Sequence, residues 1–468
     1  MSDTSITSQE DKGQRGAKSD KRHELFEEGP VAGETSEYVE GNLEKQAEAH
    51  FHRLGWKRLT VVLIVEAIAL GALSLPAAFA TLGMVAGVIT TVGLGILATY
   101  ASYVVGEVKI KFPHVAHFAD AGTLIAGRFG YELISAMFVL QLTFLVGSHC
   151  LTGTLAFLNI TSNGACSLVF GVVSAIILLL LAIPPSFAEV AILGYIDFVS
   201  VVVAIGVTMI ATGVQASDSV AGLSGVEWSA WPKEDLSFTD AIVAVSNIAL
   251  AYSFSMCQFS FMDEMHTPSD YIKSIKALGI IEIVIYTLTG SIIYAFVGQD
   301  VQAPALLSAG STVSKVAFGI ALPVIFISGS INTIVCARYI HGRIFKNSVI
   351  RFINTRNGWL TWFAVITFLT IVAWIIAEAI PFFSDLLSLM SSLFVSGFSY
   401  YLPAIFWYML IRDGSAFSRQ NLIHTVMNLL ALVVGLVLLV AGTYASIVDI
   451  KKQFDEGKVH GVFSCSPL

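Results

Sequence analysis

A few ionisable and polar residues lie inside long apolar segments of this sequence, and they are the ones that could do chemistry. Glu66 and Asp197 each bring a carboxyl group into such a segment. The loss of water there favours the neutral carboxyl, which could carry a proton between two aqueous faces. Ser328, Asn332 and Thr333 cluster late in another segment, where their oxygens could hold a small cation. Hydrogen bonding between helices is the alternative role for all five side chains.

Two further charged residues, Glu282 and Lys315, lie near the starts of their apolar segments. A long charged side chain near the end of a span usually extends to the aqueous face. We therefore expect both residues to snorkel, and we assign neither of them a role.

The segment that holds Glu66 is interrupted at Gly71 and Pro76. Proline lacks a backbone N–H and strains the preceding turn, and glycine loosens the helix before it. In lipid, a break at mid-membrane depth is tolerated only where protein, water or a ligand satisfies the freed backbone groups. Broken helices near the midplane form the binding sites of many transporters. The interruption therefore indicates either such a site or a simple proline kink.

A second irregular stretch lies in the sixth apolar segment. Tyr252 and Phe254 alternate there with the small polar residues Ser253 and Ser255. Polar backbone and small side chains at one depth suggest a second break, beside which an aromatic ring could close over an apolar substrate. Packing of helices through small residues is the alternative.

The composition predicts the elements that must position these residues. Of the 468 residues, 55% are hydrophobic and 13% are charged, against about a quarter charged in soluble domains. The formal net charge of -8 argues against nucleic-acid binding. A span needs roughly 20 apolar residues. We therefore expect an all-α membrane protein with about eleven spans, at residues 59–80, 84–106, 132–158, 167–183, 190–214, 239–260, 277–298, 313–337, 359–378, 384–410 and 424–448.

The remaining residues form two tails. Residues 1–51 are hydrophilic and predict a disordered cytoplasmic tail without a signal peptide. Residues 52–450 form the transmembrane domain, and residues 451–468 form the C-terminal tail. Lysine and arginine gather in alternate loops, with Lys233 the main exception, which places the N-terminus in the cytoplasm. Eleven spans then put the C-terminal tail outside, although its lysines disagree mildly.

The five cysteines lie far apart in the sequence, and no pair has the spacing of a zinc or redox site. Most of them fall in apolar segments, where we expect small buried side chains.

The motifs at the two irregular stretches resemble those of a known family. The stretch from Gly71 to Pro76 is followed by the stretch from Phe79 to Gly83, and the Tyr252 region leads into Phe261-Met-Asp-Glu-Met. Over about residues 52 to 450, the sequence resembles the amino acid/auxin permease family, and within it the fungal neutral amino acid permeases of the methyltryptophan-resistance type.

The resemblance implies a LeuT-type fold, with two inverted five-helix repeats, one further helix, and unwound centres in helices 1 and 6. It also implies a substrate site and places Asp197 where a sodium ion sits in sodium-coupled relatives. The implied substrate site comprises Leu70, Gly71, Ala72, Leu73, Ser74, Gln141, Phe144, Tyr252, Ser253, Phe254 and Ser255. Two positions depart from the family pattern, because Ala69 replaces a common glycine and Glu66 is unusual there.

The predicted function is the proton-coupled symport of neutral aliphatic or aromatic amino acids. Glu66 and Asp197 are the candidate coupling residues, and no cofactor is expected beyond the transported proton, with sodium the weaker choice. The partners are the amino acid and the bilayer, and no obligate protein partner is evident. We expect the plasma membrane, although a vacuolar relative would carry similar features. The alternative is an amino acid sensor that signals through its N-terminal tail. No motif of a membrane-embedded enzyme is present.

Overall fold

The computed structural model describes residues 55–465, apart from residues 69, 186, 221, 264, 347, 349, 351, 352, 354 and 458–461. Within that range, the side chains of residues 65, 66, 70 and 187–192 are also outside the description. The described residues all belong to the second of the two units into which the chain divides, Phe51–Leu468. The predicted N-terminal tail falls outside the described residues and stays a prediction.

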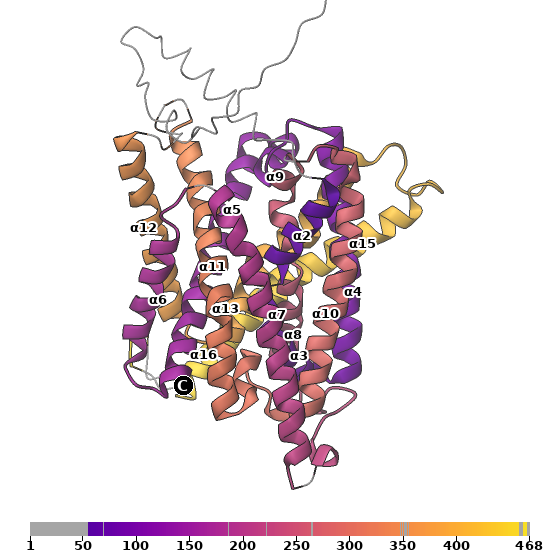
Figure 1. Ribbon diagram of the computed structural model, residues 1–468. Coiled ribbons are helices and arrows are strands. Elements are labelled where there is room, and N and C mark those ends of the chain that lie inside the picture. The colour runs from indigo at the N-terminus through magenta and orange to yellow at the C-terminus, as the bar shows by residue number, and fades with distance from the viewer. Residues whose placement is uncertain are drawn as a thin grey trace, which may run out of the picture. The chain divides into compact units, whose positions relative to one another are not determined.

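The described part of the second unit is built from helices (Figure 1). The longer helices are α2 (Trp56–Ala67), α3 (Leu75–Leu82), α4 (Met84–Lys111), α5 (Phe118–Thr161), α6 (Ser167–Leu181), α7 (Phe187–Asp218), α8 (Phe238–Ala251), α9 (Gln258–Asp263), α10 (Tyr271–Val297), α11 (Ser311–Ile344), α12 (Arg356–Ala379), α13 (Phe383–Met390), α14 (Leu402–Phe406), α15 (Leu422–Val437) and α16 (Thr443–Asp455). Short 3-10 turns join them at η1 (Leu70–Ser74), η2 (Gly222–Gly225), η3 (Phe254–Cys257), η4 (Pro268–Asp270), η5 (Gly298–Asp300) and η6 (Ala305–Ala309).

Four stretches of π-helix interrupt the last two long segments of the chain. Three of them follow α13, namely η8 (Ser391–Val395), η9 (Gly397–Tyr401) and η10 (Trp407–Ile411). The fourth, η11 (Leu438–Gly442), joins α15 to α16. Short π-helical stretches are rare and frequently occur at functional sites.

Nine helical segments of the described residues are long and apolar enough to cross a membrane. They are Met84–Lys111, Phe118–Thr161, Leu193–Asp218, Phe238–Asp263, Pro268–Asp300, Ser311–Ile344, Arg356–Ala379, Phe383–Ile411 and Leu422–Asp455. Two shorter apolar helices, Gly71–Leu82 and Ser167–Leu181, accompany them. Each predicted span overlaps one of these helices, which confirms the all-α membrane architecture.

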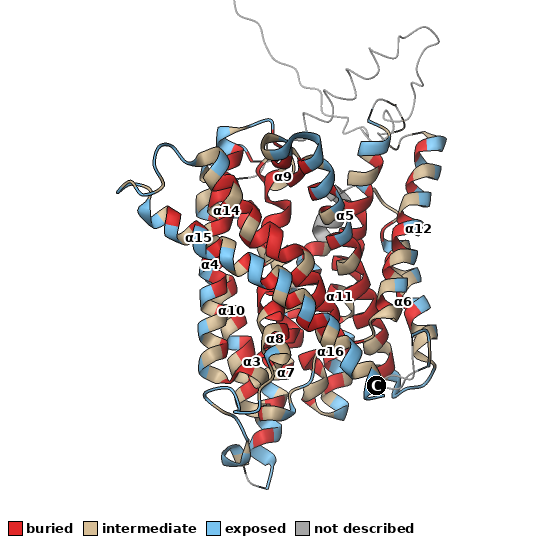
Figure 2. Ribbon diagram, turned by 180° about the vertical axis from the view of Figure 1, so that it is seen from behind, coloured by how far each residue is buried: buried red, intermediate tan, exposed pale blue. Residues whose placement is uncertain are grey.

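Burial divides the bundle into a core and a periphery. The segments that contain α8, α11 and α13 are the most enclosed, whereas α6, α12 and α15 turn many side chains outward (Figure 2). Large apolar side chains lie on these outward faces, among them Phe368 and Val433. An apolar outer surface matches a lipid environment, because a bilayer removes the penalty of exposing such side chains to water.

Helix α5 begins earlier than the sequence predicted. It starts at Phe118 rather than residue 132, and its backbone is non-helical at Ala126 and Gly127. Gly127 has a φ of 58°, a conformation that favours glycine. The first turn forms because the Asp120 carboxylate accepts hydrogen bonds from the backbone N–H groups of Ala116 (3.0 Å) and His117 (2.9 Å). The predicted boundary missed this N-terminal piece, since Asp120, Arg128 and several glycines interrupt its apolar run.

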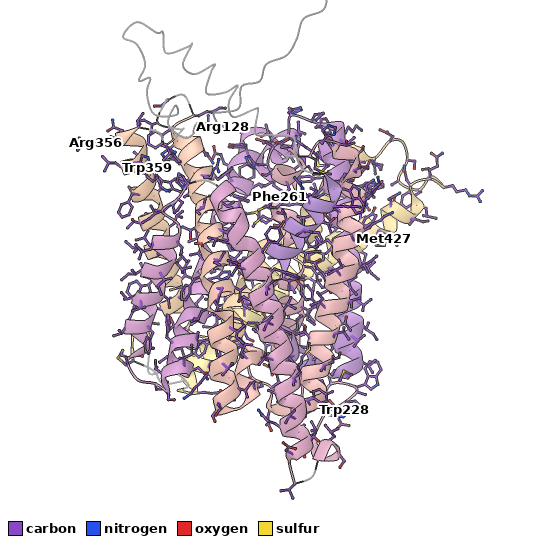
Figure 3. All side chains as sticks on the ribbon, viewed as in Figure 1. Arg128, Trp228, Phe261, Arg356, Trp359 and Met427 are labelled. Atoms are coloured by element: carbon purple, nitrogen blue, oxygen red, sulfur yellow. A yellow bond between two sulfur atoms is a disulfide. The ribbon has the colours of Figure 1, made fainter. Side chains whose placement is uncertain are left out.

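Arginines that the sequence assigns to loops lie at one end of the bundle. Arg128 and Arg356 lie at one end, and Trp228 lies at the opposite end (Figure 3). This arrangement agrees with the alternation of lysine and arginine between loops in the sequence.

Cysteines behave in two ways. Cys150, Cys257 and Cys336 are buried and free, as the sequence predicted. Cys166 and Cys465 form a disulfide across 299 residues, a pairing that their spacing did not reveal. Beside it, the Ser167 hydroxyl donates a hydrogen bond to the Ser464 carbonyl oxygen (3.2 Å). The C-terminal tail is therefore fastened to the start of α6.

Candidate functional site

The break predicted in the first segment is present. Helix α2 ends at Ala67, and α3 begins at Leu75 after the 3-10 turn η1. Pro76 occupies the first turn of α3, where a missing N–H costs nothing because that group has no intrahelical partner. The sequence thus ends one helix and starts another at this depth. The feature is a discontinuity and not a simple proline kink.

Hydroxyl groups satisfy carbonyl oxygens that this first break frees. The Tyr286 hydroxyl of α10 donates to the Ala67 carbonyl oxygen (2.8 Å). The Ser74 hydroxyl donates to the Gly71 carbonyl oxygen within the turn itself (2.9 Å). One bond comes from a neighbouring helix and the other is local. The protein itself thus supplies donors for two of the carbonyl oxygens at the break.

The second predicted break is also present. Helix α8 ends at Ala251, and the chain resumes helical geometry in η3 and α9. The Ser399 hydroxyl of η9 donates to the Tyr252 carbonyl oxygen (3.1 Å). In return, the Ser255 hydroxyl donates to the Phe398 carbonyl oxygen (3.0 Å). The π-helical turn η9 therefore holds this break through hydrogen bonds in both directions.

The two breaks touch each other. A Cβ atom built on Gly71 would lie 3.2 Å from the Cα atom of Ala251 and 3.6 Å from its backbone nitrogen. A side chain at this position would push the two backbones apart, so the absence of one favours their close approach. In Figure 1, α2 and α9 lie toward one end of the bundle, and α3 and α8 lie toward the other. Segments that are far apart in the sequence thus interrupt their helices at one place.

The predicted substrate residues gather around this contact to different degrees. The side chains of Ala72, Leu73, Ser74, Tyr252, Phe254 and Ser255 are buried, and that of Ser253 is partly buried. The Leu70 side chain lies outside the described set. The ring of Phe144 on α5 packs against Phe394 of η8, with 5.6 Å between centroids. Phe144 belongs to the third predicted segment, and Phe394 belongs to the tenth. The contact therefore links the third segment to the part of the tenth that contains η9, which bonds the second break.

Some buried polar atoms in this region have no hydrogen-bond partner. They include the side-chain carbonyl oxygens of Gln141 and Asn247 and the hydroxyl of Tyr400. A buried polar group left unpaired costs about 1–3 kcal/mol. Water or a polar ligand could satisfy these atoms, which is a property expected of a binding site.

A second polar group forms between α7 and α11. The Ser328 hydroxyl donates to a carboxylate oxygen of Asp197 (2.6 Å), and the other carboxylate oxygen has no partner. Asp197 is 1% exposed. The Asn332 amide and the Thr333 hydroxyl instead donate to carbonyl oxygens of their own helix (2.9 and 3.0 Å). The structure joins Asp197 to Ser328, whereas Asn332 and Thr333 bond within α11.

Of the other predicted coupling residue, Glu66, the structure describes only the backbone, within α2. Its role stays a prediction.

Glu282 lies in a different environment from the one that the sequence indicated. It was expected to reach water from the end of a span, but α10 begins earlier than predicted and Glu282 is 0% exposed. Both of its carboxylate oxygens are buried without a hydrogen-bond partner. If the start of α10 had been placed at Tyr271, Glu282 would have been predicted to lie well inside the helix and not near its end.

A cavity of about 570 Å³ lies at the ends of α7 and α10. Its lining includes Gln215, Glu227, Gln299, Asp300 and Ser308, and none of the residues of the two breaks. Among the described residues, no group of three or more His, Cys, Asp or Glu side chains could hold a metal ion.

Comparisons with known proteins decide the family. Residues 52–448 match the model of the family described as transmembrane amino acid transporter protein. The chain belongs to this family. It is 62% identical over 426 residues to the N amino acid transport system protein of Neurospora crassa, covering 91% of each chain. A protein of Fusarium pseudograminearum named transmembrane transporter is 28% identical over 93% of this chain and 91% of its own.

A solved transporter shares the fold of this family member. Mhp1 is a nucleobase-cation-symport-1 family transporter, solved in a closed conformation with bromovinylhydantoin bound. It superposes with a TM-score of 0.54 at 13% identity, over 86% of this chain and 94% of its own. The protein is therefore a multi-pass membrane transporter of amino acids and not an enzyme.

Proposed function

We propose that the protein is a proton-coupled symporter of neutral amino acids, which bind where the two broken helices meet. The contact between Gly71 and Ala251 carries this proposal. Each break offers the end of one helix and the start of the next, so carbonyl oxygens and amide N–H groups occur together near this contact. Carbonyl ends attract an ammonium group, and amide ends attract a carboxylate. A free amino acid carries both groups.

A neutral side chain suits the residues at this contact. None of the described side chains of residues 71–74 and 252–255 is charged, and Leu73 and Phe254 are buried apolar residues. A charged substrate side chain would need a counter-charge when it is removed from water. Aliphatic and aromatic amino acids need only apolar contacts beyond the backbone groups.

Proton coupling is assigned to Asp197, with Ser328 as its partner, and to Glu66. The bond between Asp197 and Ser328 crosses from α7 to α11 and leaves one carboxylate oxygen unpartnered. A proton can neutralise that group in the position where, by resemblance, a sodium ion sits in sodium-coupled relatives. One proton moving inward gains about 2.3 kcal/mol per 100 mV. A tenfold concentration ratio requires about 1.4 kcal/mol, so one proton supports more than tenfold accumulation.

The proposed topology has eleven crossings, arranged as two inverted five-helix repeats and one further helix. Two observations support it. The broken helices fall in the first and sixth predicted segments, which are equivalent positions of the two repeats, and Mhp1 shares the overall fold. The nine long segments make nine of the eleven proposed crossings. The shorter helix α6 makes one more, and the broken pair α2 and α3 together make the other.

The proposed orientation puts the N-terminus in the cytoplasm and the C-terminal tail outside, in the plasma membrane. Arg128 and Arg356 share one end, as expected of a cytoplasmic face (Figure 3). The disulfide Cys166–Cys465 follows the opposite end of α5, and disulfides persist in oxidising compartments.

Reconstitution in liposomes tests the coupling. Labelled neutral amino acids should accumulate when a proton gradient is imposed, and a sodium gradient should have no effect. Asp197→Asn should cut proton-driven accumulation at least tenfold while counterflow exchange of substrate persists. Accumulation driven only by sodium, or an Asp197→Asn variant with the full response to the proton gradient, would overturn this assignment.

A further inference from the structure

Glu282 stands out because nothing in the described structure compensates for its burial. The residue lies well inside α10, with 0% exposure and two unpartnered carboxylate oxygens. The ion pairs of the described residues involve other carboxylates. On α10 itself, Lys273 and Lys276 are exposed and point away from the buried face. A structural glutamate would be expected to have a partner, and this one has none.

Phenol groups, not cations, surround the Glu282 carboxyl. It interacts electrostatically with Tyr252, Tyr286 and Tyr400. The Tyr252 hydroxyl donates to the Thr91 carbonyl oxygen (2.9 Å), and the Tyr286 hydroxyl donates to the Ala67 carbonyl oxygen (2.8 Å). The rings of Tyr252 and Tyr286 meet edge to face, with 5.2 Å between centroids. Two of the three phenols thus donate elsewhere, and the Tyr400 hydroxyl is unpartnered.

The position of Glu282 relates it to both breaks. Tyr252 is the first residue after α8, and Tyr286, one turn beyond Glu282 on α10, bonds the last carbonyl of α2. At the other end of α2, the Ser274 hydroxyl of α10 donates to the Trp56 carbonyl oxygen (2.8 Å). Glu282 lies between these two attachments. A movement of α2 away from α10 would therefore admit water to its carboxyl.

The helices packed against α10 carry other charged groups, both acidic and basic. The acids are Glu66 on α2, Glu107 on α4, which lies beside Tyr271, and Glu189, Asp197 and Asp218 on α7, of which Ser328 engages Asp197. Of the cations, Lys57 and Arg58 on α2 are exposed, and Lys109 and Lys111 on α4 pair with Asp263 and Asp413. No described cation stands opposite Glu282. An ionised carboxylate without a partner is costly in such surroundings. The closed arrangement therefore suits Glu282 with its proton bound.

We propose that Glu282 is a proton-binding residue of the transport cycle, which holds its proton while the two breaks are closed together and releases it to water when α2 moves away. The proposal rests on the proposed proton-coupled symport and adds a site distinct from the Asp197–Ser328 pair. The step is a simple dissociation, which leaves a hydrated carboxylate.

Transport by the full-length protein in liposomes tests the proposal. Glu282→Gln keeps the size and removes the proton site, so counterflow exchange should stay within about twofold of wild type. Accumulation driven by a proton gradient should fall at least tenfold. Glu378→Gln is the matched control, because Glu378 is only partly buried in α12, and it should behave as wild type. A Glu282→Gln variant with the wild-type response to the proton gradient would overturn the proposal.

An infrared difference measurement separates this proposal from the proposed function. The wild type and Glu378→Gln should show a carbonyl band of a protonated carboxyl that Glu282→Gln lacks. If the wild type itself ignores the proton gradient, proton symport fails and the coupling role of Glu282 fails with it. If only the band is missing, the protonated Glu282 is wrong while symport stands. If Glu282→Gln does not fold, Glu282→Met replaces it in the same measurements, because the Glu282 carboxylate accepts no hydrogen bond that methionine would lose.

Discussion

The two broken helices meet at one point but are held by different means. At the first break, the Ala67 carbonyl depends on one hydroxyl from α10, and the Gly71 carbonyl on a hydroxyl of its own turn. At the second break, Tyr252 and Ser255 exchange hydrogen bonds with η9. The side-chain hydrogen bonds named here tie the second break to η9 in both directions, whereas the first receives a single one from another helix, α10. The difference suggests that the first broken helix moves during transport and the second serves as its fixed counterpart.

Gly71→Leu should have the largest effect on this arrangement. The backbone contact with Ala251 leaves little room for a side chain, since a Cβ atom would lie 3.2 Å from the Ala251 Cα and every further carbon would add to the crowding. We expect substrate binding and counterflow to fall at least tenfold, and Gly71→Ala to fall less, because a single methyl group requires only a small shift. Binding of a labelled amino acid to purified protein measures the effect.

The control for this pair is Gly93→Leu. Gly93 is an exposed glycine of α4, and no atom lies within 4 Å of the place that a Cβ atom would take there, so the variant should bind as wild type. Normal affinity in Gly71→Leu would show that substrate binds elsewhere than at the contact between the breaks.

Ser399→Ala should have the next largest effect, because it removes the anchor of the second break. The Tyr252 carbonyl is fully enclosed, so no water replaces the lost donor, and the unpaired group costs about 1–3 kcal/mol. We expect the KM for uptake to rise roughly tenfold. Ser396→Ala is matched to it, because the Ser396 hydroxyl bonds only within its own helix, to Ser392. Equal KM values in the two variants would contradict the anchoring role of η9.

The sequence predicts the breaks better than it predicts what holds them. Gly71, Pro76 and the polar residues after Tyr252 mark the interruptions, because their backbone chemistry is local. The donors Tyr286 and Ser399 carry no such mark, since a tyrosine or serine in an apolar segment is equally suited to ordinary helix packing. Only the tertiary arrangement brings them to the freed carbonyls.

The same distinction explains the other differences between prediction and structure. The spans were located from continuous apolar runs, so the interrupted start of α5 was missed and Glu282 was placed too near a helix end. Cys166 and Cys465 meet because both follow helix ends on one side of the bundle, which no spacing rule expresses. Asp197 and Ser328 were selected separately for their polarity, and the pairing of α7 with α11 joined them.

Tyr286→Phe should have the smallest effect of the three changes. Among the described residues, Tyr286 supplies the one hydroxyl from another helix that bonds the Ala67 carbonyl, so the change removes one ordinary hydrogen bond, at a cost of about 1 kcal/mol. If the first broken helix is the mobile one, loosening it should change the rate of transport more than the affinity. We expect a change of a few-fold in the maximal uptake rate with KM nearly constant, the reverse of Ser399→Ala. Tyr195→Phe, on the exposed face of α7, is the control. A rise in KM equal to that of Ser399→Ala would mean that both breaks are fixed parts of one binding site, and that the moving element lies elsewhere.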